Sequence, residues 1–231
     1  MVKKGKLIVI DGTDGSGKAT QVALLEMKLK KDGRTVKIVD FPEYYKNFFG
    51  EFIGHCLSEQ YYNFVKVHPK IASVLYAADR FESKGELESW LSLGYVVLAN
   101  RYVSANQIHQ GGKISNPSKR AAYMKWLEKM EYEVFKIPRP DVVLYLDVPI
   151  ELTSKMMKER NKNDKGRAYL GKKKDVHEKD QNFLENSRKS ALWLTKHDRN
   201  FIKIECAKKG TMLSRDEIHG MIYENVKNIL K

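Results

Sequence analysis

A glycine-rich stretch with one lysine lies near the start of the chain, and its residue types suit the binding of phosphate. It reads LIVIDGTDGSGKAT over residues 7–20, which is the pattern G-x-x-x-x-G-K-[ST] with Ala19 at the last position and Thr20 after it. Glycines let backbone N–H groups turn inward around an anion. A following helix points its positive end at the anion, and Lys18 supplies a mobile cation. The stretch therefore predicts a phosphate-binding loop, formed by Gly12, Thr13, Gly15, Ser16, Gly17, Lys18, Ala19 and Thr20.

Asp14 and Ala19 stand out within this loop. A carboxylate at position 14 would repel phosphate unless a metal ion or a sugar hydroxyl occupied it. The hydroxyl that usually follows the loop lysine binds magnesium, and Ala19 has none. We therefore take Asp14 and Thr20 as candidate metal ligands, and we expect another carboxylate or a water molecule to replace the missing hydroxyl.

Other groups able to bind a nucleotide follow later predicted strands or share a helix near them. Tyr76 and Arg80 lie four apart and so on one face of a helix, and Arg101 and Gln110 follow a strand. Arginine forks match phosphate oxygens or a base carbonyl, an aromatic face stacks on a base, and an amide bonds base edges. Together these side chains would hold a nucleoside monophosphate. Taken singly, Arg80 could equally pair with a structural acid, and Tyr76 could belong to the core.

The elements that position these residues alternate along the chain. Apolar runs predict five strands, at 7–10, 35–39, 95–99, 142–146 and 201–204. Helical patterns are predicted at 20–31, 48–57, 69–80, 86–93, 117–136, 150–160, 177–196 and 214–230. Strands that alternate with helices predict an α/β fold, a five-stranded parallel sheet with helices on both faces. No linker or repeat interrupts the pattern, so residues 1–231 are expected to form a single domain.

Composition and charge limit the class of protein. The chain has 231 residues, of which 42% are hydrophobic, so we expect it to be globular. Its net charge of +13 suits anionic partners. Basic residues crowd the segment 158–174, where Tyr169 is the one aromatic residue, a pattern that does not favour a nucleic-acid groove. We expect this segment to be a mobile basic lid at about 158–176.

The cysteines and the lengths of the apolar runs indicate the cellular compartment of the protein. The two cysteines, Cys56 and Cys206, are far apart and have no metal-ligand spacing, so we interpret them as reduced thiols. The first apolar run is too short for a signal sequence, and no run approaches the ~20 residues that span a membrane. The sequence therefore predicts a cytoplasmic protein with no membrane association.

Six motifs, in this order, together resemble the thymidylate kinase family: LIVIDGTDGSGKAT, FPEY, LYAADR, NRYVSANQIHQG, PDVVLYLDVP and DVHEKDQNFL. The resemblance runs from about residue 6 to residue 193. It implies a phosphate-loop fold of the nucleoside monophosphate kinase type, usually a homodimer. It also implies an enzyme that uses ATP and Mg²⁺ to convert dTMP to dTDP in dTTP synthesis.

The resemblance also implies a role for each matching position. The loop glycines and Lys18 would hold the ATP phosphates, and Asp14 would meet the dTMP sugar hydroxyl or the metal. Arg101 would bind the dTMP phosphate. Around dTMP the remaining matches are Phe41 and Pro42 at the monophosphate, Tyr44 near the phosphoryl group, Tyr76 stacked on thymine, Arg80 at the base or phosphate, Asn106 and Gln110 along thymine and sugar, and Glu178 near the sugar and metal.

Several positions depart from the family. Gly15 stands where other members have Arg, a pattern that goes with catalytic basic residues in the lid, so Arg160, Arg167 or a nearby lysine is expected to reach the transferring phosphoryl group. Ala19, Asn100 and His109 replace a hydroxyl, an Asp and an aromatic residue, and they bear on metal placement and sugar selectivity.

Two alternatives remain at this point. One is a kinase for another monophosphate, such as dUMP, CMP or AMP, although FPEY, ADR and NRY argue against adenylate kinase. The other is a nucleic-acid-binding P-loop ATPase, motivated by the charge of +13; despite that charge, we do not expect nucleic acid to be a partner.

Overall fold

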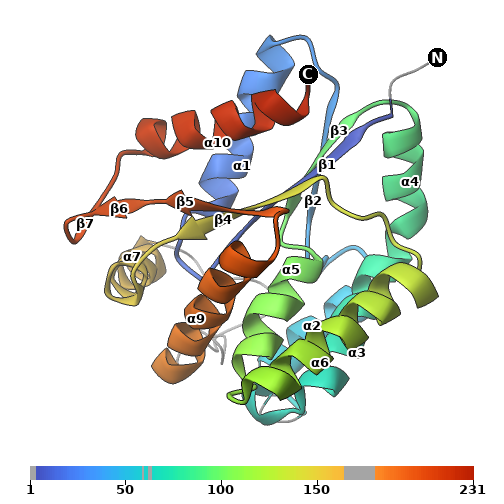
Figure 1. Cartoon of the computed structure of the whole chain (residues 1–231), viewed down its shortest axis with the longest axis vertical. Helices are drawn as coiled ribbons and strands as arrows, with labels where there is room; N and C mark the ends of the chain where they lie inside the picture. Colours follow the sequence, from blue (N-terminus) through green and yellow to red (C-terminus); the bar gives the residue numbers. More distant parts are fainter. Residues whose placement is uncertain (1–3, 59, 62–63, 164–179) are drawn as a thin grey trace.

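The computed structural model describes residues 4–58, 60–61, 64–163 and 180–231 (Figure 1). Within these residues, five strands form one parallel sheet in the order β2-β3-β1-β4-β5. They are β1 (Lys6–Gly12), β2 (Val36–Asp40), β3 (Val96–Asn100), β4 (Val142–Asp147) and β5 (Phe201–Glu205). The predicted five-stranded parallel sheet is confirmed. Because all five strands are parallel, their carboxyl ends meet at one edge, where open α/β sheets bind ligands.

Helices cover both faces of the sheet because successive side chains of a strand point to opposite sides. In β1, Leu7 and Val9 pack into one core, and Ile8 and Ile10 pack into the other. The first core also receives side chains of α4 (Lys84–Ser92), α6 (Pro117–Glu128) and α9 (Gln181–His197). The second receives side chains of α1 (Lys18–Lys31) and α10 (Arg215–Ile229), which lie together on one side of the sheet in Figure 1.

Local side-chain contacts and a proline determine where several of the helices begin. The Asn47 side chain caps α2 (Phe48–Leu57) by accepting a hydrogen bond from Gly50 N at 2.7 Å. Pro69 starts α3 (Pro69–Glu82), where its missing N–H has no consequence. A capping box of Ser214 and Glu217 opens α10. Other short elements include the 3₁₀ turn η1 (Phe64–Lys66) and the hairpin of β6 (Ala207–Lys208) and β7 (Thr211–Met212).

Two predicted stretches differ from the structure. The helix predicted at 117–136 is α-helical only to Glu128 and continues as the π-helical segment η3 (Lys129–Val134). A second π-helical segment, η2 (Asn106–Gln110), follows the single turn α5 (Val103–Ala105) where no helix was predicted. A π turn adds one residue per hydrogen-bonded ring and shifts side chains around the helix. Both segments direct polar side chains inward, including Glu131 and Gln110.

The last predicted helices shift at their ends. α7 (Ile150–Asn163) extends past the predicted residue 160. α9 begins at Gln181 instead of 177, because the side chain of Asp180 accepts a hydrogen bond from Phe183 N at 2.9 Å and caps the helix there. The part of the predicted lid beyond Asn163 lies outside the described residues. Within the described ranges, no helix combines the length and apolar composition that crossing a bilayer requires, and Cys56 and Cys206 are buried and unbridged.

Candidate active site

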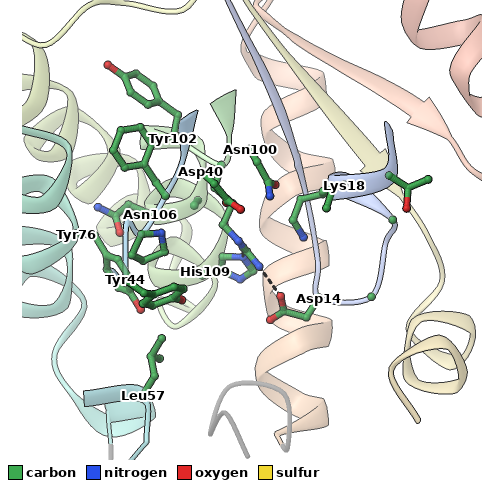
Figure 2. A pocket seen from close by; sticks show the side chains of 18 of the residues that line it. Asp14, Lys18, Asp40, Tyr44, Leu57, Tyr76, Asn100, Tyr102, Asn106 and His109 are labelled. Carbon is green, nitrogen blue, oxygen red and sulfur yellow. Dashed lines mark hydrogen bonds and ion pairs between the residues drawn. The ribbon is translucent and has the colours of Figure 1, made fainter. Parts of the chain in front are cut away.

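The segments that follow β1, β2 and β3 meet in one cleft of about 810 Å³ at the carboxyl edge of the sheet (Figure 2). Lys18 and Arg101 both line it. So do most of the residues predicted from the sequence, namely Asp14, Gly15, Gly17, Ala19, Thr20, Phe41, Pro42, Tyr44, Tyr76, Arg80, Asn106 and Gln110. Gly12, Thr13 and Ser16 form the buried part of the loop. Arg167 and Glu178 lie outside the described residues, and Arg160 lies in α7 with no side chain described.

The phosphate loop closes over its own lysine. Lys18 Nζ donates hydrogen bonds to the carbonyl oxygens of Gly12 and Thr13, each at 3.0 Å. Burial, with the positive charge of Arg101, lowers the pKa of Lys18 to about 8. Gly17 precedes α1 at φ 87°, a conformation that a side chain would strain. The loop therefore holds the Lys18 cation on backbone carbonyl oxygens at the lining of the cleft.

Gly15 lets α7 pack closely on the loop. A Cβ atom at this position would lie 2.7 Å from the carbonyl oxygen of Thr153 and 2.8 Å from Cγ of Met157. Its φ of 80° is also unfavourable for other residues. An arginine could not occupy this position without moving α7. The absence of a loop arginine, noted in the sequence, is thus coupled to the placement of the helix that leads into the predicted lid.

Arg101 lines the cleft between two polar partners. Its guanidinium forms an ion pair with Asp14, marked by the dashed line in Figure 2. Its Nη1 also lies 2.9 Å from Nε2 of His109. The backbone is left-handed, with φ 65°, and its N–H donates to Ile10 O at 3.0 Å. This turn at the end of β3 directs the side chain back across the loop that follows β1.

Opposite sides of the cleft differ in chemistry. Figure 2 shows Tyr44, Tyr76 and Asn106 grouped on one side, and Lys18 and Asp14 on the other. Gln110 is buried, and its Oε1 accepts no hydrogen bond from any described residue. One side therefore offers aromatic faces and amides suited to a base, and the other offers charge suited to phosphates.

Arg80 is nearly inaccessible, at 1% exposure, and its guanidinium is hydrogen-bonded to other residues of the chain. Its Nε donates to Glu131 Oε2 at 3.2 Å, its Nη2 pairs with Oε1 of the same carboxylate, and its Nη1 lies 3.4 Å from Tyr102 O. The structural pairing considered for Arg80 is therefore present. Because Arg80 also lines the cleft, its contact with a base stays a prediction.

Sequence reasoning missed several residues of the site. Asp40, at the end of β2, lines the cleft, where desolvation raises the pKa of its carboxyl. Its position directly before FPEY could have signalled this. Asp11 is fully buried and accepts hydrogen bonds from Gly12 N at 2.8 Å and from Ser104 Oγ at 2.6 Å, and the second bond joins β1 to α5. No local sequence pattern indicates the hydrogen bond between Asp11 and Ser104, or the presence of Arg215 in the lining of the cleft.

The oxygen groups of the cleft fit a magnesium ion that arrives with a nucleotide. Mg²⁺ is usually held by one or two carboxylates together with substrate phosphates and water. The carboxylates of Asp14 and Asp40 and the hydroxyl of Thr20 line the cleft. Among the residues that the structure describes, no cluster of three or more His, Cys, Asp or Glu could hold a metal by itself. The donor set thus suits a metal shared with phosphates.

Comparison with known proteins agrees with this geometry. Residues 10–218 match the family model described as thymidylate kinase. The thymidylate kinase of Thermosipho melanesiensis is 30% identical over 202 residues, which cover 87% of this chain and 89% of that protein. That of Plasmodium falciparum is 28% identical over 230 residues, covering 98% and 92%. The solved thymidylate kinase of Candida albicans has the same fold, with a TM-score of 0.73 at 22% identity over 99% of this chain and 94% of that one. The chain belongs to the thymidylate kinase family and is a nucleoside monophosphate kinase, a phosphotransferase.

Proposed function

We propose that this kinase transfers the terminal phosphoryl group of ATP to dTMP, giving ADP and dTDP for dTTP synthesis. The observation that carries the proposal is that Lys18 and Arg101 line one cleft together with Tyr76, Asn106 and Gln110. Two anionic nucleotides can meet end to end only where cations offset their repulsion. The shared cleft supplies such cations, and membership of the thymidylate kinase family points to dTMP as the acceptor.

On the donor side, the phosphate loop would hold ATP. The glycine-rich loop of residues 12–20 and the amino end of α1 would attract phosphate oxygens. Lys18 would exchange the carbonyls of Gly12 and Thr13 for these oxygens, since a charged partner makes a stronger hydrogen bond than a neutral one.

On the acceptor side, Tyr76 would stack on thymine, and the open amide oxygen of Gln110 would accept a hydrogen bond from the N–H of the base. Asn106 and Arg80 would lie along the base. Arg101 would bind the dTMP phosphate through the N–H groups that Asp14 and His109 do not use. We place Phe41, Pro42 and Tyr44 at the border of the monophosphate and Glu178 near the sugar.

Transfer itself needs positioning and charge neutralisation rather than a general base, because the dTMP phosphate is already a competent nucleophile. Arg101 would align that phosphate and offset the repulsion between it and the phosphates of ATP. Arg160, Arg167 or a neighbouring lysine of a lid at about 158–176 would approach from the other side. Magnesium, held by Asp14, Asp40 or Thr20 with the ATP phosphates, would supply further charge neutralisation.

We also propose that the chain works as a single domain over residues 1–231, as a cytoplasmic homodimer. The support for a dimer is an apolar surface on α3, where Ile71, Val74 and Phe81 are 62%, 42% and 49% exposed. These positions share one helix face. Light scattering after size-exclusion chromatography measures the mass directly, and a monomer at micromolar concentration would overturn this part.

A coupled ADP-release assay with dTMP, dUMP, dGMP, CMP and AMP in turn tests the activity. We expect kcat/KM to be highest for dTMP. No turnover with dTMP, or faster turnover with another monophosphate, would overturn the proposal.

A further inference from the structure

His109 and Ser187 form a hydrogen-bonded chain that ends on Arg101. Nε2 of His109 lies 2.9 Å from Nη1 of Arg101, and its Nδ1 lies 3.1 Å from Oγ of Ser187. Ser187 Oγ in turn donates to the carbonyl oxygen of Phe183 at 2.7 Å. His109 lies in η2, and Ser187 and Phe183 lie in α9, which packs against η2.

The donors and acceptors in this chain allow one arrangement of protons. A guanidinium has only N–H donors, so the bond between Arg101 and His109 forms only when Nε2 of His109 is the acceptor. The imidazole proton is then on Nδ1 and is donated to Ser187 Oγ, which accepts it while giving its own hydrogen to Phe183 O. Every group in the chain is thereby satisfied, and the bonds fix the tautomer of His109.

The surroundings also fix the plane of the ring. His109 is 9% exposed and Ser187 is fully buried. The imidazole stacks on the Phe183 ring, with centroids 5.8 Å apart and planes 16° apart. A ring held in its plane and in one tautomer presents its acceptor to Arg101 in a single direction.

We propose that His109 is a positioning residue for Arg101, and that Ser187 sets the tautomer that lets it act. Asp14 and His109 hold two different nitrogens of the guanidinium, Nη2 and Nη1. Two fixed nitrogens define the orientation of a planar fork, whereas one leaves it free to rotate. The remaining N–H groups are thus aimed before the acceptor phosphate binds. This inference rests on the proposed function, in which Arg101 binds that phosphate.

Ser187→Ala is the central variant, because Ser187 is buried and reaches Arg101 only through its hydrogen bond to His109. We expect kcat/KM for dTMP to fall about 10-fold, the scale of one hydrogen bond to a charged group, with KM for ATP within about 2-fold of wild type. Ser190→Ala is the matched control. Ser190 is equally buried in α9 and donates to Gln107 O at 3.0 Å, outside the chain that reaches Arg101.

Two variants of His109 test the acceptor itself. His109→Phe keeps a ring that can stack on Phe183 but removes the acceptor, and we expect kcat/KM for dTMP to fall about 10- to 100-fold. His109→Gln places an oxygen acceptor near the position of Nε2, and we expect it to retain more activity than His109→Phe. Equal loss in both His109 variants, or equal kcat/KM in Ser187→Ala and Ser190→Ala, overturns the inference.

A measurement without turnover separates this inference from the proposed function. Nitrogen-15 NMR of the ligand-free wild-type imidazoles near neutral pH should show the proton of His109 on Nδ1, and Ser187→Ala should give a mixture of tautomers. A proton on Nε2 in the wild type overturns the positioning role even if dTMP is phosphorylated. If the proton is on Nδ1 of His109 but the enzyme does not phosphorylate dTMP, only the proposed function is overturned.

Discussion

Replacing Arg101 with alanine tests the chemistry of the site separately from the folding of the chain. Asp14 and His109 each engage one nitrogen of its guanidinium, and a guanidinium has five N–H donors. The others are available to phosphate oxygens in the cleft. Arginines that stabilise a transferring phosphoryl group contribute roughly 10³–10⁵ in rate. We therefore expect Arg101→Ala to lower kcat at least about 10³-fold, or about 4 kcal/mol of transition-state stabilisation.

The same substitution should change folding stability little. The ion pair between Arg101 and Asp14 lines the cleft, with side-chain exposures of 18% and 17%, so water can solvate Asp14 once the arginine is removed, and we expect the loss to cost about 1 kcal/mol. Arginine and alanine both carry a Cβ atom, so both bear the strain of φ 65°. Arg101→Gly removes that strain, and we expect it to be about 1 kcal/mol more stable than Arg101→Ala while being equally inactive.

The assay combines ADP release at saturating ATP and dTMP with thermal unfolding of each variant. Arg101→Lys keeps the positive charge but loses the planar guanidinium that can bind a phosphate through two nitrogens. We therefore expect its kcat to lie between those of wild type and Arg101→Ala. An Arg101→Ala enzyme within 10-fold of wild-type kcat would refute the role given to this arginine. So would an Arg101→Gly variant that recovers activity together with stability.

Three further results are expected. Gly15→Ala should lower the melting temperature more than Gly33→Ala, since both glycines have positive φ but only the former would place a Cβ against Met157 and its helix; equal losses would contradict the close packing. Lys18→Met should abolish turnover yet raise the ligand-free free energy of unfolding by about 1–3 kcal/mol, because burial disfavours the lysine charge and lowers its pKa to about 8; a lower melting temperature than wild type would contradict this. Burial raises the pKa of Asp79 from 3.8 to about 6, so its contribution to stability is present below about pH 4 and is lost as pH rises through 6. Asp79→Asn should flatten chemical-denaturation stability over that window and add at most about 3 kcal/mol at neutral pH; an unchanged pH profile would show that Asp79 is not the group responsible.

The sequence by itself determined the framework of this protein. The strands and the phosphate loop were predicted because each is encoded by neighbouring residues, such as the apolar run 7–10 and the glycines around Lys18. The order of strands and helices then placed Arg101 and Tyr76 near one edge of the sheet, since parallel strands share the direction of their carboxyl ends. Local periodicity and turn chemistry suffice for such features because they act within a few residues.

Only the tertiary structure decided how the site is held. Glu131, 51 positions from Arg80, supplies its buried partner, and Ser187, 78 positions from His109, fixes the imidazole. Neither pair has a sequence pattern, because a lone buried acid or serine looks the same whether or not a partner packs opposite it. The π-helical turns that direct Glu131 and His109 inward arise from packing against neighbouring helices, since intrinsic propensity favours the α-helix. The types of group at the site were therefore encoded locally, whereas their orientation depends on contacts between distant segments.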